Sequence, residues 1–145
     1  VFMALVGGGG AGNIAGSNPA GTGTTLNYIG DHVYAYSGTF SSTNASQTML
    51  EFSTGSEYIV GTLTVNGAID FSSANIDAGV ASGFRISING EVISLLKTDS
   101  GAEDMPTNSM QELVLAPFTD VKVEIIAAGN NLSFLNTTSF VGRIY

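Results

Sequence analysis

The sequence contains no cysteine, no tryptophan, one histidine and only four basic residues. Without cysteine, disulfides, thiolate catalysis and Cys-ligated metals are excluded. Because His32 is the single histidine, a His-rich metal site is excluded and a His-based triad would require that residue. A net charge of -8 leaves no basic cluster that could neutralise several phosphates. We therefore expect no nucleic-acid partner.

Long apolar runs are missing too. The apolar segment Val1–Val6 has no basic region before it and is far too short to span a bilayer. We expect neither a signal peptide nor a membrane anchor in this sequence, and no membrane partner. A chain that opens on valine fits either removal of an initiator methionine or a cleavage, and the sequence leaves both open.

What the sequence does contain is alternation of apolar and polar residues. At 145 residues it is long enough for one domain with a substantial core. Short alternating runs are separated by turn residues, and no amphipathic helix is evident. This pattern predicts an all-β fold, an antiparallel β-sandwich of jelly-roll type with about eight strands. The predicted strands include 33–40, 49–53, 57–66, 110–115, 120–127 and 132–145.

The strongest local signal is Asn89–Gly90 between two alternating runs. Asn-Gly supplies the two positive φ values that a two-residue type I′ hairpin needs. Counting outward from this turn pairs Ile86 with Ile93 and Phe84 with Leu95 on the core face. A second Asn-Gly pair, Asn66–Gly67, is interpreted as another turn. Residues 70–83 and 97–109 are interpreted as long connections.

Residues 1–30 carry no charged side chain, and 7–25 are rich in glycine. We divide the chain into an extended Gly-rich arm, 1–30, and a β-sandwich domain, 31–145. Ordering a residue costs roughly 1 to 2 kcal/mol of backbone entropy, most for glycine. An ordered arm therefore needs a large contact surface, which neighbouring chains or its own domain could provide. No Lys-Ser/Thr follows the glycines as in a phosphate loop, and we expect no cofactor.

Several polar residues were weighed as catalytic or metal-binding groups. The loop holding Asp99, Glu103 and Asp104 is acidic, but its spacing does not match an EF-hand. We interpret it as a solvated loop and predict no metal site. His32 beside Asp31 is interpreted as a polar residue at a strand start rather than a general base.

Pairs of acids could in principle form a glycosidase centre. Glu51 with Glu57, and Asp70 with Asp77, are such pairs, but no feature of the sequence brings either pair into a cleft. We predict no catalytic residue, and the protein is expected not to be an enzyme.

The one aromatic grouping consists of Tyr28, Tyr34 and Tyr36. Tyr34 and Tyr36 share a strand face because they are two residues apart. They could be covered by the arm or a neighbouring subunit, or they could stack on a sugar ring.

Three stretches resemble small virion accessory proteins of tailed phages, especially marine ones. The first is the tyrosine strand followed by EFSTGSEYIVGTLTVNG (51–67), the second is LVLAPFTDVKVEI (113–125), and the third is FVGRIY (140–145). The resemblance lies in an "L-x-x-P-F-T-x-V" turn between two strands and a terminal "G-R-x-Y" strand. It implies a non-enzymatic capsid decoration, cement or fibre-like subunit, located on the surface of the virion.

By analogy of fold, such a protein is expected to be a homo-oligomer, a trimer by preference, partnered by itself and by a major capsid or other virion protein. Two alternatives stay open, a bacterial cell-surface or filament subunit that assembles by arm or strand exchange, and a carbohydrate-binding receptor-recognition module. The residues expected at the assembly interface are Val1, Phe2, Met3, Leu5, Val6, Tyr34 and Tyr36.

Overall fold

The computed structural model describes residues 26–69, 81–99, 107–127 and 131–145. Within these ranges the chain forms ten strands and no helix, in two antiparallel sheets, which confirms the predicted all-β sandwich. The strands are β1 (Asn27–Ile29), β2 (His32–Tyr36), β3 (Phe40–Ser42), β4 (Gln47–Ser53), β5 (Ile59–Ile69), β6 (Ala81–Ile88), β7 (Glu91–Asp99), β8 (Thr107–Leu115), β9 (Asp120–Ala127) and β10 (Asn131–Ile144).

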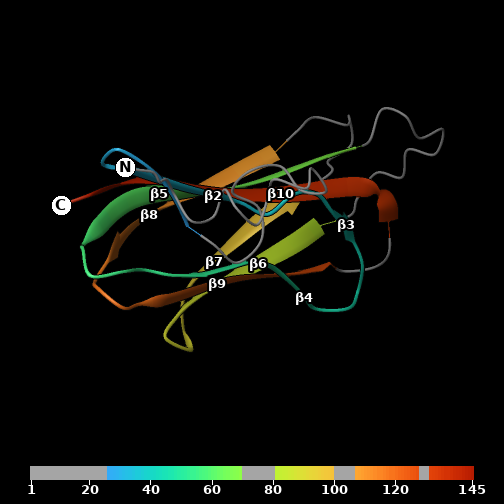
Figure 1. Ribbon diagram of the computed structural model, residues 1–145. Coiled ribbons are helices and arrows are strands. Elements are labelled where there is room, and N and C mark those ends of the chain that lie inside the picture. Colours follow the sequence, from blue (N-terminus) through green and yellow to red (C-terminus); the bar gives the residue numbers. More distant parts are fainter. Residues whose placement is uncertain (1–25, 70–80, 100–106, 128–130) are drawn as a thin grey trace, which may run out of the picture.

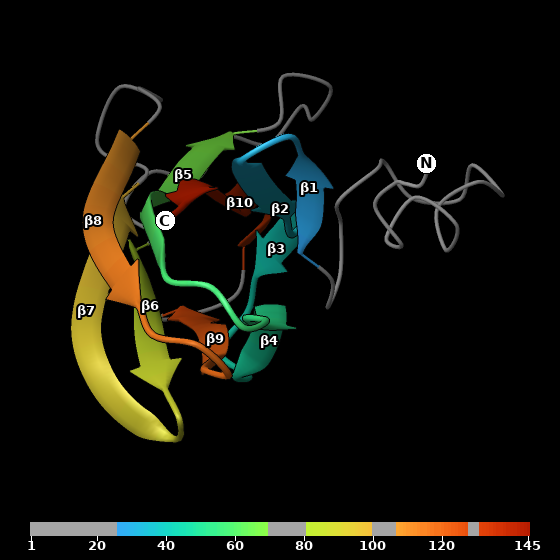
Figure 2. The same ribbon diagram turned by 60° about the vertical axis from the view of Figure 1, so that its left-hand side comes forward.

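The two sheets form the two layers seen in Figure 1. One has the order β1-β2-β10-β5-β8, with β3 also paired to β10, and the other has the order β4-β9-β6-β7. Figure 2 shows β8 of the first sheet beside β7 of the second at one side of the sandwich. We call the layers the β10 sheet and the β9 sheet. The jelly-roll type of the sandwich stays a prediction.

The core lies between the layers and follows the predicted alternation. On β9, Val121, Val123 and Ile125 are buried, as are Ile59, Leu63 and Val65 on β5. The outward residues alternate with these, so each sheet has one apolar and one solvated face. The same pattern in β2 buries Val33 and Ala35, and in β10 it buries Phe140.

Two phenylalanines and two glycines set the contact at the centre of the core. The rings of Phe52 on β4 and Phe140 on β10 lie with centroids 5.2 Å apart, tilted by 37°. Gly61 and Gly142 are direct partners in the β10 sheet. A Cβ at Gly61 would lie 2.7 Å from Cζ of Phe140, so the ring can occupy its place only because Gly61 has no side chain.

A chain of buried polar groups joins the sheets farther along. Ser42 on β3 and Ser82 on β6 bond through their hydroxyls at 2.7 Å. Asn136 on β10 donates its Nδ2 to Ser42 Oγ (2.8 Å), and Thr98 on β7 donates to Asn136 Oδ1 (2.9 Å). No buried side-chain polar atom among the described residues lacks a partner. Each sheet contributes two members, so the polar chain ties the two layers together.

This polar chain explains why the predicted turn at Asn66–Gly67 is wrong. The two residues lie inside β5, paired to both β10 and β8. A Cβ at Gly67 would lie 2.9 Å from both Asn136 Oδ1 and Thr98 Oγ1. The glycine therefore permits a close approach of side chains and does not mark a turn.

The hairpin between β6 and β7 is confirmed at its turn. Asn89 and Gly90 have φ values of 51° and 85°, as a type I′ turn requires. Asn89 also ties the turn to β9, because its N–H donates to Asp120 O and its Oδ1 accepts from Asp120 N–H.

Beyond the turn, the predicted register is wrong by one residue. Ile88 pairs with Glu91, but Ile86 pairs with Ser94 and Phe84 with Leu96. A β-bulge at Ile86/Ser87 accounts for the shift, because it inserts one unpaired residue and reverses the faces that follow. Leu96 consequently packs on the core and Leu95 points to solvent.

Several boundaries also differ from the prediction. β6 begins at Ala81, inside the predicted connection 70–83, and β7 continues to Asp99 while β8 begins at Thr107. The boundary between arm and domain at residue 30 stays a prediction. Leu26 is part of the core, and β1 pairs with β2.

We predict that Gly90→Val destabilises the protein by roughly 1 to 2 kcal/mol, because a β-branched residue would have to adopt a positive φ. Gly83→Val is the matched control. Gly83 lies on the same hairpin without a positive φ, and an added Cβ would meet its nearest neighbour at 3.8 Å. Thermal unfolding followed by circular dichroism measures both. Equal melting temperatures for the two variants would contradict the assignment of the turn.

Candidate functional site

The acidic pairs weighed from the sequence do not form a shared centre in the described residues. Glu51 lines a polar hollow on the outer face of the β9 sheet, together with Asp120 and Lys122. Glu57 lies in the β4–β5 loop, where it accepts a hydrogen bond from Ser56. Asp70, Asp77, Glu103 and Asp104 lie outside the described residues, as does the side chain of Asp99.

No group of three or more histidine, aspartate or glutamate side chains in the described ranges is arranged to hold a metal. The described ranges likewise hold no helix long and apolar enough to cross a membrane.

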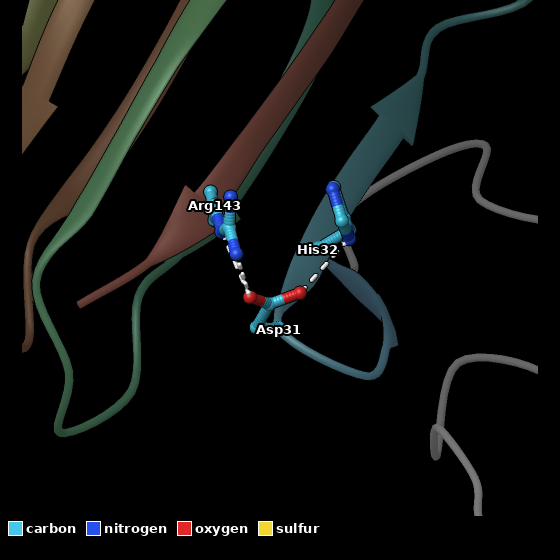
Figure 3. A network of polar contacts seen from close by, with 3 residues as sticks. All are labelled: Asp31, His32 and Arg143. Carbon is cyan, nitrogen blue, oxygen red and sulfur yellow. Dashed lines mark hydrogen bonds and ion pairs between the residues drawn. The ribbon is translucent and has the colours of Figure 1, made fainter.

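Asp31 and His32 are held by an arginine of the closing strand (Figure 3). The carboxylate of Asp31 lies 2.7 Å from Nη2 of Arg143 and 3.0 Å from Nδ1 of His32. The hydrogen bond from Arg143, aided by the nearby positive charge, holds the pKa of Asp31 below its ordinary value. All three side chains are well exposed, and His32 is the first residue of β2, as predicted. The network fixes the β1–β2 turn against β10.

Tyr34 and Tyr36 lie on the outer face of the β10 sheet, as the spacing predicted. Their rings contact each other, with centroids 5.5 Å apart and planes tilted by 43°. Val141 on β10 lies on the same face beside them, because it is the cross-strand partner of Tyr34. Other apolar side chains on the same face are exposed as well, namely Val60, Met110 and Val114. We call this surface the tyrosine face.

A second group of exposed aromatic residues lies at the end of the sandwich where the β8–β9 turn and the β4–β5 loop connect the two sheets. Phe118, in the turn between β8 and β9, is 76% exposed and has a φ of 55°. Its N–H donates to Gly55 O in the β4–β5 loop. In that loop Tyr58 is exposed too, and its carbonyl accepts from the exposed Tyr145. These three residues form what we call the aromatic end.

Tyr28, the third tyrosine of the sequence grouping, lies on β1 and not on the tyrosine face. Burial, together with the negative charge of Glu57, raises the pKa of its hydroxyl above the ordinary value. Its cross-strand partner on β2 is the buried Val33, so Tyr28 lies on the opposite face of the sheet from Tyr34 and Tyr36.

The outer face of the β9 sheet carries an apolar groove over Gly83. Two adjoining hollows of about 330 and 430 Å³ both include Gly83 and Ile126. Leu95, 74% exposed, and Leu96 also line the first hollow, and Lys97 and Ala81 line the second. We call this surface the Gly83 groove.

Charged residues beside the groove are paired with one another. Arg85 donates from Nε to Glu124 Oε1 at 3.0 Å, and Lys122 lies 3.6 Å from Glu124 Oε2. The groove is therefore apolar at its centre and charge-paired along one side.

Sequence reasoning missed Leu95, Ile126 and Phe118 as surface residues. The bulge that turns Leu95 outward has no signature in the alternation. Ile126 follows Ile125 directly, and two adjacent apolar residues on a strand must point to opposite faces, so that pair was an available signal. At Phe118 no signal was available, because a non-glycine residue after proline does not indicate a positive φ.

Taken together, these features define an antiparallel β-sandwich with exposed apolar side chains on the outer faces of both sheets. No protein-family model matches the sequence, and neither does any curated protein. Among solved structures, the chain is similar to one in the structure of infectious bursal disease virus Gx strain, at 13% identity and a TM-score of 0.46. That match covers 77% of this chain and 32% of the virus chain.

A chain of the Gt strain of the same virus is similar at 13% identity and a TM-score of 0.43, with coverage of 81% and 34%. Dimeric latent PorU from Porphyromonas gingivalis is similar at 16% identity and a TM-score of 0.39, with coverage of 73% and 11%. The present chain thus spans about a third of the virus chains. Because these three TM-scores are all below 0.5, no function is inferred for this chain from the similarities.

We predict that Phe118→Gly stabilises the fold by roughly 1 kcal/mol, because glycine adopts a positive φ without the steric cost that phenylalanine has. Thermal unfolding measures the change. Phe118→Ala is the control, since it removes the ring but keeps the Cβ, and we expect it to gain nothing. A glycine variant no more stable than the alanine variant would show that the turn is not strained.

For the polar network we predict that Arg143→Gln raises the pKa of Asp31 toward its ordinary value. Because the pKa is lowered in the folded state, the stabilisation is present above the unfolded value of about 3.9 and is lost as the pH falls through the folded value. The variant should therefore melt below the natural protein at neutral pH and together with it in strong acid. A difference in melting temperature that does not depend on pH would contradict this account.

Proposed function

We propose that the protein is a non-enzymatic structural subunit of a virion, a capsid decoration, cement or fibre-like protein that is held in its assembly by the N-terminal arm. The observation that carries the proposal is the placement of exposed apolar side chains. They gather on the tyrosine face, at the aromatic end and in the Gly83 groove.

Apolar side chains exposed on several surfaces can serve as contacts between subunits. Monomeric soluble proteins rarely expose contiguous apolar patches beyond a few hundred Å², and larger ones mark interaction sites. Here exposed apolar residues occur on the outer faces of both sheets, for example Val141 on one and Leu95 on the other. Charged residues make up only 11% of the sequence, so subunits can pack together with little burial of charge.

The strand pairing supports the jelly-roll type of sandwich that the sequence predicts. Four antiparallel pairs are nested like those of one long hairpin, namely β2 with β10, β4 with β9, β5 with β8, and β6 with β7. The first and third pairs lie in the β10 sheet and the second and fourth in the β9 sheet. A long hairpin wrapped so that its pairs alternate between two sheets is a jelly roll, an architecture found in viral capsid and lectin domains.

The sequence of the arm suits an attachment element. Val1, Phe2, Met3, Leu5 and Val6 lie outside the described residues. Each of their large side chains contributes roughly 1.5 to 3 kcal/mol if fully buried. Such burial in a neighbour offsets much of the ordering cost of the arm, whereas the glycines that follow contribute little contact surface.

A bacterial surface or filament subunit is the second candidate, and the open sheet edges favour it. β1 and β8 end one sheet, and β4 and β7 end the other. An extended segment of another copy could add to such an edge by main-chain hydrogen bonds. For the carbohydrate-binding alternative, the rings of Tyr34 and Tyr36 are tilted by 43° and do not form one flat platform.

The virion role is tested by quantitative mass spectrometry of gradient-purified virus particles prepared from the source of this sequence. We expect this chain to co-purify with intact particles in a fixed ratio to the main shell protein. Its absence from the particles would contradict the proposal. Glycan-array binding lost in the double variant Tyr34→Ala, Tyr36→Ala would instead favour the carbohydrate-binding alternative.

The role of the arm is tested by a shortened chain that begins at Leu26. We predict that this chain keeps the β-type circular dichroism and the melting transition, because Leu26 and every strand of the sandwich are retained. It should lose assembly when measured by size-exclusion chromatography with light scattering. Normal assembly of the shortened chain would show that the arm is not the anchor, and failure to fold would show that it belongs to the core.

A further inference from the structure

We propose that the Gly83 groove is the receptor for the apolar arm segment Val1–Val6 of a neighbouring copy. The inference rests on the proposed arm-mediated assembly and names the surface to which the arm binds. It follows from the shape and chemistry of the groove, and from the length and composition of the chain that precedes Leu26.

The groove exists because of two local features of the β9 sheet. Gly83 has Ile126 and Lys97 as its cross-strand partners, and it places no side chain between them. The β-bulge at Ile86/Ser87 turns Leu95 outward beside this gap. Glycine leaves the floor open, and the leucine and isoleucine form apolar walls. An added Cβ at Gly83 would meet only the carbonyl of Ile126, at 3.8 Å, so the fold does not require glycine at this position.

The chemistry of the groove matches that of the arm. Glu124, the acid beside the groove, is already paired with Arg85 and Lys122. Val1–Gly30 carries no charged side chain, and its large apolar residues are concentrated in Val1–Val6. An uncharged apolar segment can therefore enter without leaving a buried charge unpaired.

The length of the arm allows the segment to reach a neighbour. The 19 residues from Gly7 to Thr25 separate the apolar segment from Leu26, which is anchored in the core. Fully extended, they span about 65 Å, whereas a compact domain of this size is about 38 Å across. Leu26 precedes β1 at the edge of the β10 sheet, and the groove is on the outer face of the other sheet. A neighbouring copy can present its groove directly to this arm, whereas the arm's own groove faces the other way.

Disulfide trapping between singly substituted full-length chains tests the proposal, and the absence of native cysteine makes the background clean. Chains carrying Leu5→Cys are mixed with isotopically labelled chains carrying Leu95→Cys, which places a thiol beside the groove. The matched control is Val114→Cys, 71% exposed on the tyrosine face against 74% for Leu95. Mixed disulfides are then counted by intact-protein mass spectrometry.

We expect the Leu5–Leu95 pair to form at least about tenfold more linked dimer than the Leu5–Val114 pair, because docking raises the effective concentration of the two thiols toward millimolar. Equal yields, or a preference for Val114, would overturn the proposal. A double variant, Leu5→Cys with Leu95→Cys, that closes within one chain in preference to linking two would overturn it in favour of the arm's own domain as the receptor.

A second variant tests the groove without cross-linking. Gly83→Val fills the floor of the groove and should abolish assembly while the β-type circular dichroism of the fold is maintained. Thr39→Val, at an exposed position in the connection between β2 and β3 and outside the three surfaces named above, is the control and should assemble normally. Assembly of Gly83→Val at the natural level would refute the groove as the receptor. If the chain beginning at Leu26 also assembles normally, the proposed arm-mediated assembly is wrong. If only Gly83→Val assembles normally, the arm is still the anchor and only the groove is wrong as its receptor.

Discussion

The contact between Phe140 and the bare backbone of Gly61 is the constraint on which the rest of the sandwich depends. Gly61, the partner of Gly142 in the β10 sheet, leaves room for the ring, which then packs on Phe52 of the opposite sheet. Sheets stacked face to face lie about 10 Å apart, and side chains must fill that space. The aromatic pair fills it at the centre, so the surfaces available for function are the outer faces and the ends.

The polar chain through Asn136 has the complementary role. Buried hydrogen bonds contribute modestly when made but are costly to leave unmade, so the four partners have to meet in one alignment. Two of them lie on each sheet, and their bonds fix how the sheets are offset. Gly67 beneath them has the same spatial role for this polar chain as Gly61 has for Phe140. Glycine in β5 therefore marks positions where side chains of the core approach the backbone closely.

Alternation of apolar and polar residues was sufficient to predict the fold class and the inward faces of β5, β9 and β10. It succeeds there because each strand has one buried and one solvated face. It failed in β7, because a bulge inserts a residue without any change in composition, and a shift of one residue exchanges the two faces. The turn predicted at Asn66–Gly67 was wrong for another reason. A glycine needed for close packing and a glycine needed for a turn look the same in one sequence.

Of the candidate surfaces, too, one part could be predicted from the sequence and another part could not. The shared face of Tyr34 and Tyr36 could be predicted, because residues two apart on a strand point the same way. The Gly83 groove could not, because it depends on the bulge and on pairing between strands far apart in sequence. Phe118 lay in a stretch that the phage-protein resemblance had singled out, but its positive φ and exposure are visible only in three dimensions.

These features support the proposal that the sandwich presents apolar surface outward and that an arm without charged side chains joins it to like copies. Its central claim is self-association, and sedimentation equilibrium of the purified full chain at micromolar concentration tests that claim most directly. The account predicts a homo-oligomer, with a trimer giving about three times the chain mass of 14.9 kDa. A single species of 14.9 kDa across the concentration range would contradict it.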